Sequence, residues 1–121
     1  MLKVLIVDDS PAQLLNICRI IERAGHKALV AHSGEEAIEL ANEEKPQLIL
    51  MDIIMPGMNG YQATRRLSRD ERTRDIPVIM VSSRNTETDR AWGMRQGAKD
   101  YLTKPVDDNT LLNAISSAMA A

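Results

Sequence analysis

Polar side chains that could carry out chemistry come directly after short runs of aliphatic residues. An acidic pair follows the first run, a lone aspartate the third, a serine the fourth, and a lysine comes shortly after the fifth. Unbroken apolar runs are typical of strands buried on both faces, as in a parallel sheet flanked by helices. The ligand crevice of such a sheet lies outside the carboxyl ends of its strands. We therefore expect five side chains to line one crevice: Asp8, Asp9, Asp52, Ser82 and Lys104.

Three clustered carboxylates need a positive charge beside them. Like charges in contact cost roughly 1–4 kcal/mol per pair in a watery or half-buried setting. Oxygen ligands with room for waters suit Mg²⁺, which typically takes one or two carboxylates and shares a phosphoryl oxygen. Lys104 supplies a second positive charge, and the Ser82 hydroxyl can donate to an oxyanion. This combination around Asp52 predicts a site for phosphoryl transfer to that carboxylate.

Five strands must alternate with five helices to position these residues. Polar caps begin the helices, and Gly25 and Gly97 are placed to end two of them. Strict alternation with right-handed crossovers predicts an α/β fold, an open doubly wound parallel sheet of flavodoxin-like (βα)5 type with strand order 2-1-3-4-5. The strands are predicted at 3–7, 27–31, 48–51, 78–81 and 98–102. The helix N-caps are predicted at Ser10, Ser33, Asn59 and Asp107, and the spacing predicts the fourth helix over 86–96.

Composition limits the classes of function. A chain of 121 residues with 44% hydrophobic and 26% charged residues is typical of one globular domain, and we expect residues 1–121 to form it without an effector domain. A formal net charge of −2 gives no electrostatic case for binding nucleic acid or an anionic membrane. The only cysteine, Cys18, cannot form an internal disulfide, which fits a reducing cytoplasm. Trp92, the only tryptophan, is expected to pack in the core ahead of the alternative that it marks a partner surface.

These residues together resemble the receiver domains of two-component response regulators. The resemblance extends over the whole chain, and every motif position is filled in the family's order. Any one of these motifs alone would be weak, whereas the combination is highly specific. The matching residues are the acidic pair Asp8-Asp9, the phosphoacceptor Asp52, the switch hydroxyl Ser82, the switch aromatic Tyr101 and the motif Lys104-Pro105.

The resemblance implies a role for each position. Asp9, Asp52 and the backbone carbonyl of Ile54 would ligate Mg²⁺ directly, and Asp8 would act through water. The Lys-Pro peptide bond of the family is usually cis. Ser83 departs mildly from the pattern, because the family more often has alanine or glycine there.

The resemblance also implies how the domain would signal. A histidine kinase or histidine phosphotransfer domain would donate the phosphoryl group, and a separate protein would bind the face formed by the fourth helix, fifth strand and fifth helix. The domain would act as a switch and would catalyse only its own phosphorylation and dephosphorylation. Residues 51–65 and 91–107 are similar to single-domain receivers of twitching motility, a chemotaxis-like pathway.

Three other functions are open from the residues. A phosphohydrolase of the haloacid-dehalogenase type also uses an aspartyl nucleophile, but it needs an acid two positions later, where this chain has Ile54. A nucleotide-binding module needs glycines after the first strand, and this chain has Asp-Asp-Ser-Pro. A constitutive interaction module with an inactive site should lack some of the five polar groups, whereas all are present.

Overall fold

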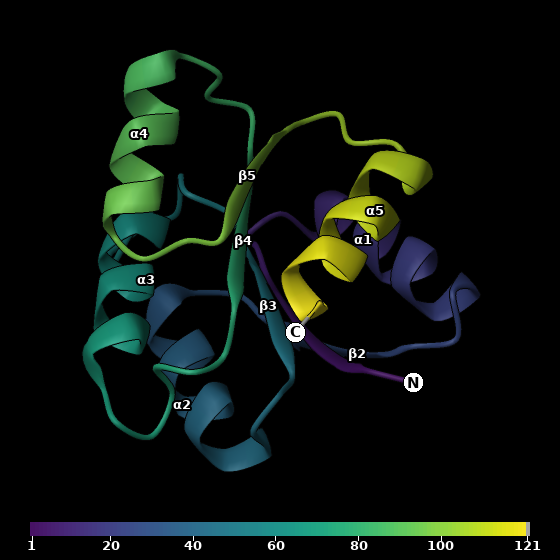
Figure 1. Cartoon of the computed structure of the whole chain (residues 1–121), viewed down its shortest axis with the longest axis horizontal. Coiled ribbons are helices and arrows are strands. Elements are labelled where there is room, and N and C mark those ends of the chain that lie inside the picture. The colour runs from purple at the N-terminus through teal and green to yellow at the C-terminus, as the bar shows by residue number, and fades with distance from the viewer. Residues whose placement is uncertain (121) are drawn as a thin grey trace.

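A computed structural model describes residues 1–120 and shows one parallel sheet between two helical layers (Figure 1). The strands lie in the order β2-β1-β3-β4-β5, as predicted. The strands are β1 (Lys3–Val7), β2 (Lys27–Ala31), β3 (Leu48–Met51), β4 (Val78–Ser82) and β5 (Asp100–Thr103), and the helices are α1 (Pro11–Arg23), α2 (Gly34–Glu44), α3 (Gly60–Arg69), α4 (Glu87–Arg95) and α5 (Asp108–Met119).

The register of the sheet brings the strand ends to one edge. Val7 of β1 pairs with Met51 of β3, and Met51 pairs with Met80 of β4. The residues that follow Val7 and Met51 are the aspartates predicted to share a crevice. Parallel pairing in this register therefore places Asp8 and Asp52 on neighbouring strands at the same level.

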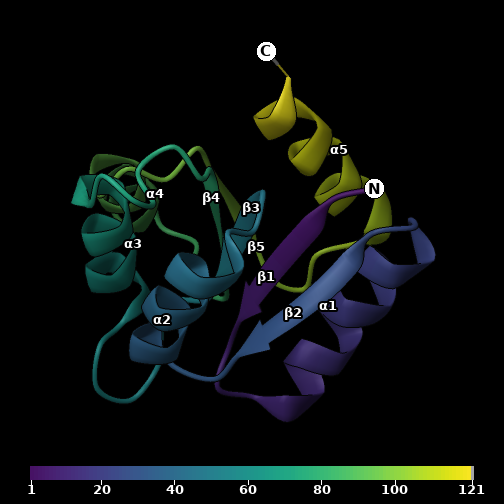
Figure 2. The same ribbon diagram turned by 90° about the horizontal axis from the view of Figure 1, so that it is seen from below.

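The sheet is covered on both faces, which explains its unbroken aliphatic strands. Helices α1 and α5 pack on one face, and α2, α3 and α4 lie on the other (Figure 2). Side chains from successive strand positions enter the two cores alternately, as with Val4 and Leu5 of β1. No helix among residues 1–120 is long and apolar enough to cross a membrane.

The helices begin at the predicted caps. The Ser10 hydroxyl accepts a hydrogen bond from the Gln13 backbone N–H at 3.4 Å, and Pro11 occupies the first turn of α1. Asn59 and Gln62 form a reciprocal capping box at the start of α3. Local sequence therefore fixes where these helices begin and how each strand is connected to the next helix.

Two boundaries in the second half differ from the prediction. Strand β5 begins at Asp100 rather than 98, because Ala98 still donates its backbone N–H to the carbonyl of Gly93 in α4. Gly97 adopts a φ of 112° in this helix ending, which favours glycine. At the other boundary, Ser82 is the last residue of β4 rather than the first residue after it, and it pairs with Thr103.

Helix α4 does not follow the predicted apolar pattern. It buries Asp89 and Gly93, whereas Trp92 is 45% exposed. The prediction that Trp92 packs in the core was therefore wrong. The buried face of α4 carries Gly93 instead of Trp92, because this face packs directly against the ring of Tyr101. The close packing leaves no room for a side chain at position 93.

Candidate functional site

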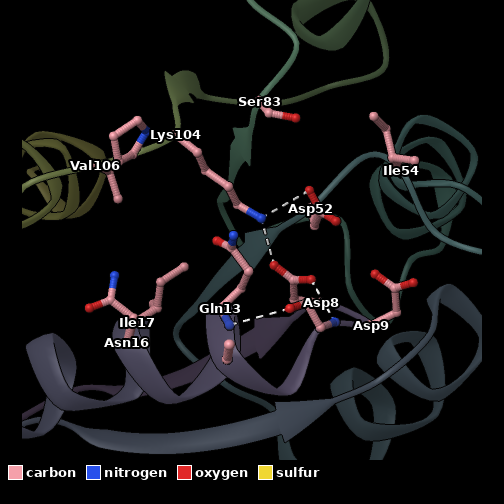
Figure 3. Close-up of a pocket in the computed structure, with 13 residues that line it drawn as sticks. Asp8, Asp9, Gln13, Asn16, Ile17, Asp52, Ile54, Ser83, Lys104 and Val106 are labelled. Atoms are coloured by element: carbon pink, nitrogen blue, oxygen red, sulfur yellow. Dashed lines mark hydrogen bonds and ion pairs between the residues drawn. The ribbon is translucent and has the colours of Figure 1, made fainter.

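A cavity of about 600 Å³ opens at the carboxyl edge of the sheet, where the sequence predicts the site. It lies between the loops that follow β1, β3, β4 and β5, and Figure 3 shows the Lys104 side chain directed toward Asp8 and Asp52. Four of the five predicted side chains line this cavity: Asp8, Asp9, Asp52 and Lys104.

Lys104 joins two of the carboxylates. Its Nζ donates to Asp8 Oδ2 at 2.7 Å and to Asp52 Oδ1 at 3.3 Å, and all three side chains are largely buried. The backbone N–H of Lys104 also donates to the carbonyl of Ser82 at 2.8 Å, which fixes the start of the loop. The Lys104–Pro105 peptide bond is cis, as the family resemblance implies.

The acidic groups are close enough to share a cation. One carboxylate oxygen from each of Asp8, Asp9 and Asp52 lies within 4.8 Å of the other two. Asp8 also accepts the backbone N–H of Ser10 at 2.9 Å, whereas Asp9 is exposed. The cavity holds three carboxylates and one lysine, which contacts only Asp8 and Asp52, so the oxygen ligands and their net negative charge fit a hard divalent cation such as Mg²⁺.

Burial and charge act in opposite directions on Asp52. Burial raises the pKa of its carboxyl above the usual 3.8, Lys104 lowers that pKa, and the neighbouring Asp8 carboxylate raises it. The net effect is a raised pKa, so the ionised form of Asp52 is stabilised less here than in water. A carboxylate that its surroundings stabilise poorly is a better nucleophile or ligand than one already saturated with hydrogen bonds.

Ile54 lies at the mouth of the cavity. Its side chain is 55% exposed and lines the entrance, on the loop that follows Asp52 (Figure 3). A phosphohydrolase of the haloacid-dehalogenase type needs an acidic residue two positions after its nucleophile, and this chain has isoleucine there. The role of the Ile54 carbonyl as a metal ligand stays a prediction.

Ser82 is the predicted residue that does not line the cavity. Its side chain is fully buried, and its Oγ accepts the backbone N–H of Arg84 at 3.2 Å. Ser83 lines the cavity in its place. The nearby Tyr101 side chain is 2% exposed, and its hydroxyl donates to the carbonyl of Arg84 at 2.6 Å. Ser82 and Tyr101, the two predicted switch residues, therefore both contact the loop that follows β4.

Sequence reasoning missed a second polar cluster behind this loop. Asp89 of α4 is buried, with hydrogen bonds from the side chains of Arg84, Thr86 and Tyr61. The only signal in the sequence was Thr86 three positions before Asp89, which predicts a helix cap. Nothing local could have brought in Tyr61, which is 28 positions away.

Comparison with known proteins agrees with this geometry. Residues 4–116 match the response regulator receiver domain family. The chain belongs to the receiver domain family, and it is a phosphorelay response regulator rather than a member of a classical enzyme family.

Individual relatives sharpen this assignment. The chain is 52% identical over 120 residues to Protein PilH of Pseudomonas aeruginosa, and the match covers 99% of both chains. It is 37% identical over 117 residues to the phosphate regulon transcriptional regulatory protein PhoB of Escherichia coli, and here it spans 51% of the relative. The crystal structure of chemotaxis protein CheY4 of Vibrio cholerae superposes with a TM-score of 0.92 at 27% identity, covering 98% of this chain and 99% of that one. The chain is thus a receiver protein similar over its length to PilH and CheY4.

Proposed function

We propose that Asp52 accepts a phosphoryl group from a phosphohistidine of a histidine kinase or histidine phosphotransfer domain. The observation that carries this proposal is the shared lysine: Lys104 Nζ lies 2.7 Å from Asp8 and 3.3 Å from Asp52 inside one cavity. This arrangement places Asp52 on the wall of a cavity and beside a cation, as a carboxylate nucleophile requires.

The chemistry follows from these positions. An Asp52 carboxylate oxygen attacks phosphorus as the bond from phosphorus to the histidine nitrogen breaks, and the histidine keeps the electron pair and takes up a proton. Lys104 neutralises charge on the transferred group. We assign Asp9, Asp52 and the Ile54 carbonyl as direct ligands of Mg²⁺, and Asp8 as a ligand through water. When bound, this ion would supply charge neutralisation at the phosphoryl oxygens.

Signalling then depends on the loop after β4. In the proposed phosphorylated form Ser82 rotates toward the phosphoryl oxygen. The family resemblance implies that Tyr101 turns inward in that form, but its ring is already buried here, so we propose that it stays buried when Ser82 moves. The face formed by α4, β5 and α5 changes shape and binds a separate target protein. We propose that residues 1–121 act as a single receiver domain in the cytoplasm, with a role in twitching motility, a chemotaxis-like pathway. The resemblance of residues 51–65 and 91–107 to receivers of that pathway supports this role.

Fluorescence of Trp92 tests the proposal, since Trp92 is the only tryptophan and lies half-exposed on α4. The protein is titrated first with Mg²⁺ and then with beryllofluoride, a mimic of the aspartyl phosphate. We expect a saturable response to each in wild type, and no beryllofluoride response in Asp52→Asn. Calorimetry repeats both titrations, so that a silent tryptophan does not hide binding. If neither method detected beryllofluoride binding to the wild type, the chain would be a constitutive interaction module.

A further inference from the structure

The cluster around Asp89 satisfies a buried carboxylate completely. Arg84 Nε donates to Oδ1 at 2.9 Å, the Thr86 hydroxyl donates to Oδ2 at 2.6 Å, and the Tyr61 hydroxyl lies 3.3 Å from Oδ1. The Tyr61 hydroxyl is also 3.2 Å from the Asp89 backbone carbonyl. Asp89 lies outside the cavity, so none of the proposed chemistry requires this carboxylate.

Arg84 connects this cluster to the switch. Its side chain binds Asp89, while its backbone carbonyl accepts the Tyr101 hydroxyl at 2.6 Å and its backbone N–H donates to Ser82 Oγ at 3.2 Å. A shift of the 83–86 loop would therefore break the Tyr101 contact. The position of Tyr101 thus depends on what holds Arg84 in place.

The side chains around Tyr101 pack closely against its ring in the inward position, in which the ring is buried. Its ring lies in a small core with Ile53 and Met80, against which Tyr61 packs. A Cβ added at Gly93 would lie 3.1 Å from the Tyr101 ring and 2.6 Å from Met80 Sδ. Glycine is unfavourable inside a helix relative to alanine, so the close approach explains why glycine is needed there.

Tyr61 links the cluster back to the acidic cavity. Tyr61 is the second residue of α3. The preceding residue, Gly60, donates its backbone N–H at 2.9 Å to the carbonyl of Ile53, the residue that follows Asp52 in the chain. Burial raises the pKa of Tyr61 to about 12, so its hydroxyl stays protonated and donates. Asp89 is therefore held by three side chains: Arg84 and Thr86 of the 83–86 loop, and Tyr61 of α3.

We propose that Asp89 is a positioning residue that, with Tyr61, holds the 83–86 loop in the form that keeps Tyr101 inward before any phosphoryl group binds. This inference rests on the proposed function of Asp52 and adds to it. When Ser82 turns toward the phosphoryl group, Arg84 loses its bond to Ser82 Oγ but keeps the one to Asp89. The 83–86 loop is then already in the conformation that the bound phosphoryl group, or beryllofluoride, favours. Less of the free energy of phosphoryl-group binding is therefore used to reorder the loop.

The two tyrosines of the chain make the test direct. Protein labelled with 3-fluorotyrosine should give two ¹⁹F resonances, and the Tyr61→Phe variant assigns the remaining one to Tyr101. In Asp89→Asn we expect the Tyr101 resonance to move toward the position of a solvent-exposed tyrosine. We also expect the beryllofluoride dissociation constant to rise about fivefold while that of Mg²⁺ is unchanged. Tyr61→Phe, which loses only a hydroxyl, should shift both readouts less and in the same direction.

Glu87→Gln is the matched control, because it removes a carboxylate from the same turn of α4 where the side chain is exposed. It should leave both readouts at the wild-type value. An unchanged Tyr101 resonance and unchanged beryllofluoride affinity in Asp89→Asn would overturn the proposal, as would an equal loss of Mg²⁺ and beryllofluoride affinity. If Asp89→Asn does not fold, Tyr61→Phe decides by the same criteria. A wild type that does not bind beryllofluoride would refute the function of Asp52, and the Tyr101 resonance would still decide the role of Asp89.

Discussion

Asp52 and Asp89 are both 8% exposed, yet their pKa values move in opposite directions. The pKa of Asp52 is raised above 3.8, chiefly by burial. The pKa of Asp89 is lowered below 3.8, chiefly by the Thr86 hydroxyl and then by the Arg84 guanidinium. Exposure alone therefore does not tell whether a buried aspartate is reactive or structural.

The difference lies in the number of donors that each carboxylate has. Asp52 shares a single lysine with Asp8, and that lysine lies closer to Asp8. Asp89 has three side-chain donors and no neighbouring acid among its contacts. A carboxylate with too few donors can still gain from a metal or a phosphoryl group, whereas a satisfied one can only hold its neighbours in place.

The largest effect is expected on removing the one cation of the cavity. Lys104→Met leaves Asp8 and Asp52 buried side by side without their shared lysine, so the free energy of unfolding should fall by about 3 kcal/mol. Urea denaturation measures this loss, and Mg²⁺ should restore part of it because a cation again faces the carboxylates. The exposed Lys99→Met serves as control. Equal stability of the two variants would mean that Lys104 does not balance the acidic cluster.

A smaller effect is expected from filling the space beside Tyr101. Gly93→Ala raises helix propensity but places a methyl group against Tyr101 and Met80, so we expect a net loss of about 1–2 kcal/mol. The ¹⁹F resonance of Tyr101 should move outward at the same time. Thr88→Ala, on the exposed side of α4, should show neither change. A stabilised Gly93→Ala variant with Tyr101 still inward would show that the packing is loose.

The donor count also predicts opposite signs for two isosteric substitutions. Asp52→Asn removes a poorly stabilised charge, so without Mg²⁺ it should raise the free energy of unfolding by about 1 kcal/mol. Asp89→Asn removes a well-stabilised charge and should lower the thermal midpoint. Calorimetry of both variants in the absence of divalent ions measures the difference. Changes of the same sign would contradict the comparison.

Mg²⁺ should stabilise only the protein with an intact cavity. At ten times its dissociation constant, binding to the native state adds roughly 1.4 kcal/mol, and this gain should shrink strongly in Asp52→Asn. The gain should persist in Asp89→Asn, since that carboxylate lies outside the cavity. Thermal unfolding with and without Mg²⁺ measures both, and an equal gain in all three proteins would mean that the ion binds elsewhere.

The smallest effect is the pH dependence of the two carboxylates. For Asp89, whose folded pKa is lowered, the stabilisation is present above the unfolded pKa and is lost as pH falls through the folded value. For Asp52, whose folded pKa is raised, the charged form costs stability above that value, and the cost is relieved as pH falls through it. Carboxyl ¹³C titration without divalent ions should place the midpoint of Asp52 above 3.8 and that of Asp89 below it.

Much of the fold and four of the five cavity residues could be predicted, because both depend on local patterns. Aliphatic runs define buried strands, and parallel register then brings Asp8 and Asp52 together without further information. Ser82 could not be placed in the same way. Successive strand residues point to opposite faces, so the extension of β4 by one residue directs Ser83 rather than Ser82 into the cavity.

The switch region was harder to predict because its contacts are not local. Helix α4 reverses the usual pattern, with Asp89 inside and Trp92 outside. That reversal depends on Tyr61 from α3 and on Tyr101 from β5, and neither contact is visible in the spacing of α4. A buried polar cluster of this kind is specified by tertiary structure alone.

The most direct test of the central claim is the intact mass of the protein after incubation with acetyl phosphate. The account predicts the addition of one phosphoryl group to the wild type when Mg²⁺ is present, little without it, and none in Asp52→Asn. It also predicts full labelling of the Glu87→Gln control. Labelling that persisted in Asp52→Asn, or that ignored Mg²⁺, would contradict the assignment of Asp52 as the phosphoacceptor of the acidic cavity.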